Sequence, residues 1–166
     1  EGVVQGDVYL VGGGDPALDT DELADLAKAA VSAGLRGVKG RFVVDGSALP
    51  NIDQFDSSQP SYLGYNPSVS GLNFNFNRVF FEWKQTDSGY DLTLAAGGVW
   101  HKPGVRWMEI RSENRGAPVF EYSSANGHDR WSVAQSALGE AGGRWLPVRQ
   151  PVDYVGEVFQ TLAANA

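Results

Sequence analysis

A short apolar run that ends in three glycines constrains the fold of this chain more than any other segment. The run, Val8–Val11, has the β-branched and aromatic composition of a buried strand, and Gly12–Gly14 close it. Further along, Asp19 or Thr20 can cap a helix, and Gly34 is expected to end it as a left-handed cap. Apolar residues recur between them at helical spacing: Leu23, Leu26, Ala27, Ala30 and Val31.

A second apolar strand is expected about one crossover further along the chain, at residues 40–45. Residues 7–45 therefore predict a strand–helix–strand unit, whose strands run either parallel or antiparallel because the pattern alone does not set their direction. Residues 46–71 are rich in Ser, Pro, Asn, Asp and Gly, with isolated apolar anchors: Ile52, Phe55, Tyr62 and Tyr65. They predict a long ordered loop, and loops of this length are usually functional or cover another part of the protein.

From Leu72 onward, apolar residues recur with a period of two. The sequence LNFNFN at 72–77 predicts a strand with its apolar side chains on one face and Asn73, Asn75 and Asn77 on the other. The three amides could bind the backbone of the neighbouring loop or a ligand, and the structural role is favoured. Further elements are expected downstream: strands at 79–84, 90–95, 105–111 and 144–148, a hairpin turn at 86–89, a short helix at 129–138 and a final helix from Pro151.

The charge of the chain argues against nucleic acid as a partner. Thirteen Lys and Arg stand against 20 Asp and Glu, and the net charge of −7 repels a polyanion. The nearest approach to a basic stripe, Arg106, Arg111 and Arg115, is interrupted by Glu109 and Glu113. The chain has no cysteine, which excludes disulfides and thiolate metal sites. No apolar run is long enough for a membrane span.

The glycine turn also matches a dinucleotide-binding fingerprint, Gly-x-Gly-x-x-Ala, at residues 12–17. In that motif the helix begins at the glycines and its first amides meet the pyrophosphate, whereas here Asp15 and Pro16 intervene. Asp45, which mimics the ribose-binding acid, lies about 31 residues beyond Gly14 rather than about 20. Four carboxylates would repel an anion here: Asp15, Asp19, Asp21 and Glu22. We therefore predict a structural corner and no nucleotide cofactor.

The remaining candidates for catalysis are two histidines. His101 and His128 lie in polar segments that predict loops, and the chain has no Gly-x-Ser-x-Gly elbow. We expect both to be solvated side chains rather than members of a catalytic triad or a metal site. Four tryptophans lie in apolar strand or helix patterns and are expected in the core rather than on a sugar-binding face: Trp83, Trp107, Trp131 and Trp145.

Four segments, taken in order, resemble one enzyme family. They are GDVYLVGGGDPAL, GLRGVKGRFVVDGS, YNPSVSGLNFNFN and PVDYVGEVFQTLA, and the likeness extends over nearly all 166 residues. They resemble the region inserted into class C low-molecular-mass penicillin-binding proteins, the periplasmic D-alanyl-D-alanine carboxypeptidases and endopeptidases. With the pattern of elements, this resemblance implies an α+β fold. A small α/β subdomain of residues 1–75 and 145–166 would carry a nested β-rich subdomain at 76–144.

The resemblance implies an enzyme whose catalytic residues lie outside this chain. Such enzymes acylate a serine in a Ser-x-x-Lys motif and also use Ser-x-Asn and Lys-Thr-Gly motifs, but this chain has no Ser-x-x-Lys. Ser124–Asn126 matches Ser-x-Asn, and Lys102–Gly104 matches Lys-Thr-Gly except that Pro103 lacks the hydroxyl, but the two occur in the wrong order. Since the inserted region lies between the catalytic motifs, we expect a piece of a parent enzyme that is inactive alone. The start at Glu1, without Met or a leader, agrees with this expectation.

The resemblance also implies partners and a role in substrate binding. The parent would act in the periplasm on peptidoglycan peptide stems, and this region would contact its transpeptidase-like domain. In the family, an aromatic and an acid in the loop before the NPSVSG segment help to hold the free amino end of the stem. The aromatic falls on Tyr65, but the acid falls on Pro60, so Asp56 or Asp53 would have to substitute. The alternative is a stand-alone module that binds peptidoglycan peptide or glycan through Tyr62, Tyr65 and the row of Asn residues.

Overall fold

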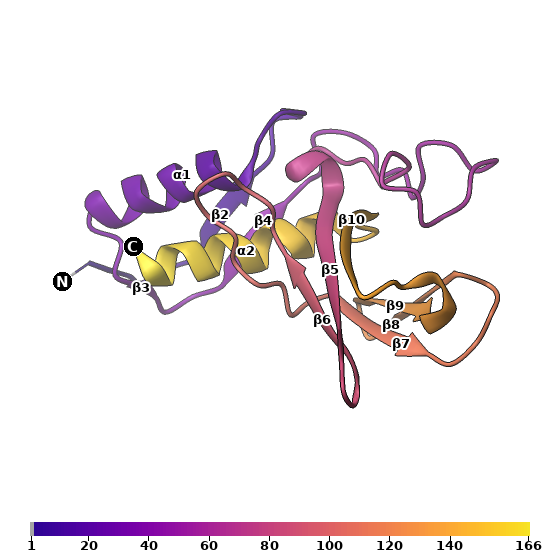
Figure 1. The fold of residues 1–166 in the computed structure, drawn as a ribbon. Coiled ribbons are helices and arrows are strands. Elements are labelled where there is room, and N and C mark those ends of the chain that lie inside the picture. The colour runs from indigo at the N-terminus through magenta and orange to yellow at the C-terminus, as the bar shows by residue number, and fades with distance from the viewer. Residues whose placement is uncertain (1) are drawn as a thin grey trace.

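The computed structural model describes residues 2–166 and has an α+β fold, which confirms the predicted class. Two helices lie side by side toward one end of the described chain, and two three-stranded sheets lie toward the other (Figure 1). The first elements in chain order are β1 (Val3–Val4), β2 (Val8–Val11), α1 (Thr20–Ser32), β3 (Gly37–Val38) and β4 (Phe42–Asp45). The later ones are β5 (Arg78–Thr86), β6 (Gly89–Ala95), β7 (Glu109–Glu113), β8 (Phe120–Ala125), β9 (His128–Ala134), β10 (Ala141–Pro147) and α2 (Pro151–Asn165).

The N-terminal unit is a strand–helix–strand unit with parallel strands. β2 pairs with β4 over the full length of both, and the short β1 and β3 also pair in parallel. α1 begins at Thr20 because Asp19 caps it: the Asp19 carboxylate accepts hydrogen bonds from the backbone N–H groups of Asp21 and Glu22, both at 2.9 Å. Gly34 follows its end with a φ of 106°, as the sequence predicts. The structure thus decides the strand direction that the pattern left open.

The two helices pack against each other, and α2 also contacts β4. The buried apolar residues of α1 are Leu23, Ala24 and Ala27. Leu26, which was expected on the apolar stripe with them, is instead exposed. On α2, Val155, Phe159 and Leu162 are buried and Val152 is half-buried. Phe159 stacks on Phe42 of β4, with ring centroids 5.5 Å apart.

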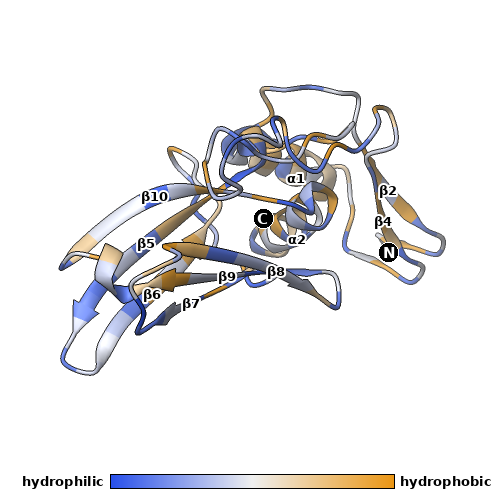
Figure 2. Ribbon diagram, turned by 90° about the vertical axis from the view of Figure 1, so that its right-hand side faces the viewer, coloured by the Kyte–Doolittle hydropathy of each residue, from blue (hydrophilic) through white to orange (hydrophobic). Residues whose placement is uncertain are grey.

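The β-rich part contains two three-stranded sheets (Figure 2). In one, β5 lies between β6 and β10 and runs antiparallel to both, and the β5–β6 hairpin turns within the predicted residues 86–89. In the other, β9 lies between β7, to which it is parallel, and β8, to which it is antiparallel. Side chains of both sheets and both helices share one apolar core. The division at 76–144 stays a prediction, and β10, which pairs with β5 along its length, extends from 141 to 147.

The helix predicted at 129–138 is wrong. Residues 128–134 form β9, and only the short turn Gln135–Ala137 follows. β9 hydrogen-bonds to a strand on each side, and this pairing outweighs a weak local preference for helix. The strand predicted at 105–111 lies later, as β7 at 109–113.

The strand predicted at 72–77 is also wrong. Asn75, Phe76 and Asn77 have left-handed backbone conformations, with φ of 51°, 54° and 49°, and form a single turn. Asn tolerates this conformation, and the buried Asn side chains hold it: Asn75 Nδ2 donates to Thr20 Oγ1 (2.8 Å) and Asn77 Nδ2 donates to the Ser68 carbonyl (2.8 Å). The structural role favoured for the Asn row is therefore confirmed, although its alternation with apolar residues does not mark a strand.

Of the four tryptophans predicted in the core, Trp107 and Trp131 are buried, whereas Trp83 and Trp145 are half-buried. The fifth, Trp100, is exposed in the segment between β6 and β7. Within residues 2–166, neither helix combines the length and the apolar character that crossing a bilayer would require.

Candidate functional site

The long loop, residues 46–71, is held to the body of the protein by the buried side chain of Arg149. One guanidinium nitrogen, Nη1, donates to the carbonyl oxygens of Asp53 (2.6 Å) and Asn66 (2.9 Å), and Nη2 donates to that of Ser61. Arg149 is only 7% exposed. A planar guanidinium carries several donors in a rigid arrangement, so one side chain fixes three separate points of the loop.

Arg149 is in turn fixed by a buried carboxylate of the second sheet. Asp129 on β9 accepts a hydrogen bond at Oδ2 from the backbone N–H of Arg149 (2.7 Å) and at Oδ1 from the hydroxyl of Tyr122 (2.8 Å). Burial raises the pKa of Asp129 above its ordinary value, although these hydrogen bonds oppose the rise. Burial, with the hydrogen bond to Asp129, raises the pKa of Tyr122 to about 12. Through Arg149 the loop is thus connected to the β7–β9–β8 sheet.

Asp56 and Tyr65, the two residues expected at the substrate rim, both lie exposed on this anchored loop. The buried side chain of Asn66, the residue after Tyr65, binds the backbone of Asp56. Its amide oxygen accepts from the Asp56 N–H and its NH₂ donates to the Asp56 carbonyl, both at 2.8 Å. The Asp56 carboxylate accepts from the hydroxyl (2.7 Å) and the backbone N–H (2.8 Å) of Ser58, which holds its pKa below the ordinary value. Asp56 is therefore presented to solvent as an anion.

Tyr65 borders an apolar groove that the sequence did not reveal. Phe55, Tyr65 and Phe76 are 76%, 67% and 60% exposed, which is unusual for large apolar side chains. With Pro67 and Arg78 they line a cavity of about 460 Å³, which we name the aromatic groove. The sequence did not indicate Phe76 as an exposed groove residue, because the period-two pattern places it beside Phe74 on a buried face of a strand. The left-handed turn instead directs the two side chains to different environments.

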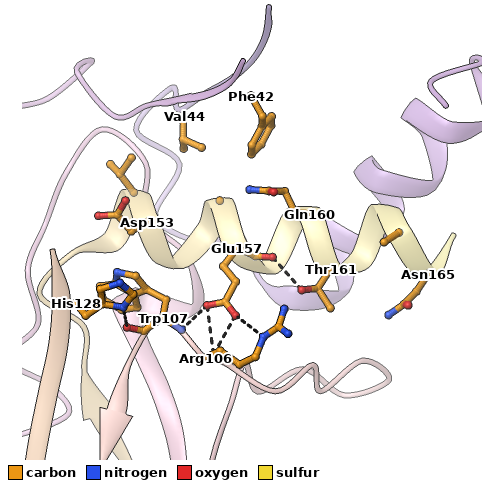
Figure 3. Close-up of a pocket in the computed structure, with 13 residues that line it drawn as sticks. Phe42, Val44, Arg106, Trp107, His128, Asp153, Glu157, Gln160, Thr161 and Asn165 are labelled. Atoms are coloured by element: carbon orange, nitrogen blue, oxygen red, sulfur yellow. Dashed lines mark hydrogen bonds and ion pairs between the residues drawn. The ribbon is translucent and has the colours of Figure 1, made fainter. Parts of the chain in front are cut away.

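A second cavity, of about 770 Å³, lies between β4 and α2 (Figure 3). Phe42 and Val44 form one wall, and Glu157 of α2 faces the segment 105–107. The Glu157 carboxylate accepts from the backbone N–H groups of Arg106 (2.9 Å) and Trp107 (2.7 Å). Its oxygens are thus occupied in holding this segment to α2, which is a structural task.

The two histidines differ from the expectation of solvated loop residues. His128 is exposed but belongs to β9, and its Nδ1 lies 2.8 Å from the Trp107 carbonyl, to which it can only donate. His101 is half-buried, and its Nδ1 lies 2.8 Å from Asp21 Oδ1. Each ring therefore meets a partner that is distant in sequence, which the sequence pattern did not indicate.

The Asp21 carboxylate also binds the backbone of the segment between β6 and β7. It accepts hydrogen bonds from the N–H groups of Val99 (2.7 Å), Trp100 (3.2 Å) and His101 (2.9 Å). Burial raises the pKa of Asp21, but these bonds and His101 outweigh it and leave the pKa below the ordinary 3.8. One side chain of α1 therefore orders a loop of the β-rich part.

Acidification is expected to release this loop from α1. Because the pKa of Asp21 is lower in the folded than in the unfolded state, its ionised form stabilises the fold above pH 3.8, and this contribution is lost as the pH falls through the lowered pKa. The amide shifts of Val99, Trp100 and His101 should titrate together in acid. The Asp21→Asn variant should lack this step, and an unchanged titration in that variant would contradict the assignment.

The glycine turn forms a structural corner, as predicted. Gly12 N–H donates to the Asp45 carbonyl and Gly14 N–H to that of Gly71, both at 2.8 Å. The Thr20 amide donates to Asn75 Oδ1 and those of Asp21 and Glu22 donate to Asp19, so these first amides of α1 are not free to bind a phosphate.

Comparison with known proteins matches residues 1–164 to the D-Ala-D-Ala carboxypeptidase 3 (S13) family. The chain belongs to this family. Two crystal structures of penicillin binding protein 4 (dacB) from Haemophilus influenzae are similar to this S13 chain. One shares 15% identity with a TM-score of 0.64, and the other, complexed with a β-lactam, shares 11% with a TM-score of 0.62.

Each comparison covers 99% of this S13 chain but only 37% and 34% of the penicillin binding protein 4 chains, so the chain spans about a third of their length. The curated proteins contain no match. The likeness to a class C penicillin-binding protein region, which the four sequence segments indicate, is thereby confirmed.

Proposed function

We propose that this chain is the accessory inserted region of a periplasmic serine-type D-Ala-D-Ala carboxypeptidase and endopeptidase that acts on peptidoglycan peptides. It gives a scaffold that contacts the transpeptidase-like domain of the same parent, and a part of the substrate rim. The role in the substrate rim is supported by one observation. Arg149 anchors the long loop, so that Asp56 and Tyr65 are exposed on a fixed backbone. Binding groups on a rigid support lose little entropy when a ligand arrives.

In this proposal Asp56 receives the free amino group of a peptide stem, and the ring of Tyr65 packs along the stem. Asp56 takes the place of the acid that the family pattern puts at Pro60. Its lowered pKa keeps it ionised at neutral pH, and an anion is complementary to an ammonium group. The exposed ring of Tyr65 offers an apolar surface to the remainder of the stem. The acyl-enzyme chemistry belongs to the remainder of the parent, because this chain has no Ser-x-x-Lys.

The rim is tested by steady-state kinetics of the parent enzyme. Tyr65→Ala and Asp56→Asn should each raise KM about tenfold, equivalent to about 1.4 kcal/mol, and leave kcat nearly unchanged, because binding is lost and the reacting atoms are untouched. For Asp56→Asn the effect should vanish with an amino-acetylated substrate. Asp25→Asn, at an exposed position of α1, is the matched control. Wild-type KM values in both rim variants would refute the assignment.

The catalytic part of the proposal predicts the outcome of labelling with penicillin. The 166-residue chain should take up no labelled penicillin covalently, whereas the parent enzyme should form a stable adduct. A covalent adduct on the 166-residue chain would overturn the proposal.

The alternative, a stand-alone peptidoglycan-binding module, requires Tyr62 and the Asn row to be available to a ligand. Tyr62 instead stacks on Phe120, with ring centroids 5.3 Å apart, and the guanidinium of Arg144 lies over its ring. The Asn side chains are buried and hydrogen-bonded within the protein. Only Tyr65 of that set is exposed, and we therefore favour the accessory region.

A further inference from the structure

The most exposed large apolar side chain of residues 2–166 lies at the tip of a hairpin. Trp100 is 83% exposed, and its neighbour Val99 is 74% exposed. Residues 96–103 fold back on themselves between β6 and β7, and the Gly98 N–H donates to the His101 carbonyl (3.1 Å) across the turn. Val99 and Trp100 are therefore the two residues of the turn, and we name residues 96–103 the Trp100 hairpin.

The Trp100 hairpin is fixed to the start of α1. The Asp21 carboxylate accepts the three consecutive N–H groups of residues 99–101, an arrangement in which backbone amides surround an anion. A Cβ atom on Gly98 would lie 3.0 Å from Thr20 Cβ and 2.6 Å from the His101 carbonyl oxygen, so this close contact requires glycine. The two apolar side chains of the tip are thus held in water on a backbone whose hydrogen bonds keep it from folding back to bury them.

This arrangement is typical of an anchor for another protein surface. Tryptophan is among the residue types that contribute most to protein–protein binding, and neighbouring exposed apolar side chains mark interaction surfaces. A tip that is already ordered loses little entropy when a partner buries it. Lys102, which is exposed and takes part in no ion pair among residues 2–166, adds a positive charge beside the tip.

The size of the tip indicates which partner it fits. A buried indole contributes about 150–250 Å², whereas a stable complex between separate proteins needs about 800 Å² from each partner. The tip alone is therefore too small to hold a free protein. It suffices for a surface that the same polypeptide keeps nearby, because a covalent link raises the effective concentration. This chain covers only 37% and 34% of the penicillin binding protein 4 chains, and a parent of their length would supply such a surface.

We propose that the Trp100 hairpin anchors this region to the transpeptidase-like domain of the same parent, with Trp100 and Val99 in an apolar recess of that domain. The inference rests on the proposed function, which supplies the parent, and it names the surface through which the two parts meet. Lys102, at the edge of the tip, faces an acidic group of the recess. Because Asp21 joins the hairpin to α1, the anchor fixes the strand–helix–strand unit and the β-rich part against the partner together.

The test compares the solvent accessibility of Trp100 in the 166-residue chain and in the parent enzyme. Hydroxyl radicals oxidise exposed indoles, and mass spectrometry of the digested protein measures the rate of oxidation at Trp100. The rate should be high in the 166-residue chain and severalfold lower in the parent, without any added ligand. Trp131, which is 2% exposed, should react slowly in both proteins and shows that both are folded.

Variants assign the protection to the indole, with acetylation of the neighbouring Lys102 as the readout. In the parent, Trp100→Ala should raise the acetylation rate of Lys102 to that of the 166-residue chain, and Trp100→Phe should recover a part of the protection. Asp87→Ala, at the exposed tip of the β5–β6 hairpin, is the matched control and should change nothing. Because the indole is exposed, Trp100→Ala should leave the Tm of the 166-residue chain unchanged, which separates loss of the anchor from misfolding.

Four results would overturn the inference. They are equal oxidation of Trp100 in the chain and the parent, protection that appears only with added peptidoglycan glycan fragments, protection that increases with protein concentration, and unchanged protection of Lys102 in Trp100→Ala. The second result would indicate a glycan as the partner, and the third a second copy of the chain. None of them alters the expected KM and penicillin results, so the proposed rim stands if Tyr65→Ala still raises KM in the parent.

Discussion

Replacing Arg149 by methionine is expected to lower the free energy of unfolding by about 3 kcal/mol, since burial of unsatisfied polar groups costs roughly 1–3 kcal/mol each. The guanidinium donates to the carbonyls of Asp53, Ser61 and Asn66, and methionine replaces none of these bonds. It also removes the positive charge that lowers the pKa of the buried Asp129. The long loop should therefore lose its order together with the stability of the fold.

Urea unfolding measures the stability loss, and amide hydrogen exchange of residues 53–66 measures the loop. Arg106→Met, at an exposed arginine, is the control and should change stability by less than about 0.5 kcal/mol. Arg149→Lys keeps the charge but not the fork of donors, and should recover only a part of the loss. Unchanged exchange in the loop of Arg149→Met would show that other contacts suffice to hold it.

Gly12→Ala is expected to destabilise the protein by about 3 kcal/mol, at the upper end of the usual cost of overpacking. A Cβ atom on Gly12 would lie 2.4 Å from the Gly71 carbonyl oxygen and 2.6 Å from Leu72 Cα. Both contacts are with backbone, which cannot rotate away as a side chain could. The corner between β2 and residues 71–72 would have to open, and the end of the long loop would move with it.

Gly13→Ala is the matched control in the same turn. A Cβ atom on Gly13 meets nothing within 4 Å among the described residues, and its φ is not in the left-handed region. Thermal unfolding of the two variants should differ by several degrees or more, because about 1 kcal/mol shifts Tm by roughly 2–8 °C in domains of this size range. Similar Tm values would mean that the glycines act through chain flexibility rather than through close packing.

Arg149→Met and Gly12→Ala each remove a support of the same long loop. Gly12 lies where the strand–helix–strand unit meets the end of the long loop, and Arg149 fixes the middle of that loop to the second sheet. The proposed rim residues Asp56 and Tyr65 lie within the stretch 53–66 that Arg149 holds. A fixed rim is what differential binding of a substrate requires, because a loop that must first be ordered loses affinity.

Much of the fold follows from short-range patterns. α1 begins at Thr20 because the Asp19 cap and Glu22 are within three residues of each other, and α2 begins at Pro151 because proline suits the first helical position. The strand predicted at 72–77 and the helix predicted at 129–138 were wrong because contacts between distant residues decide these segments. Asn75 hydrogen-bonds Thr20, 55 residues away, and β9 pairs with strands on both sides.

The candidate site was predictable only in part. Tyr65 follows from the family resemblance, which puts the acid on Pro60 and leaves Asp56 or Asp53 as its substitute. Arg149, Asp129 and Arg78 belong to no motif. Arg149 reaches carbonyls 83 and 96 residues earlier in the chain. Backbone carbonyls occur at every residue, so no residue type in the sequence marks them as its partners.

By itself, the sequence determined the α+β class, both ends of α1, the start of α2 and the use of Gly12–Gly14 as a corner instead of a phosphate loop. These features depend on spacing and on capping between residues a few positions apart. Only the tertiary structure decided that β2 and β4 run parallel, that Phe76 adopts a left-handed conformation and that Arg149 holds the loop. Each of these depends on donors, acceptors and packing surfaces that meet only when distant parts of the chain come together.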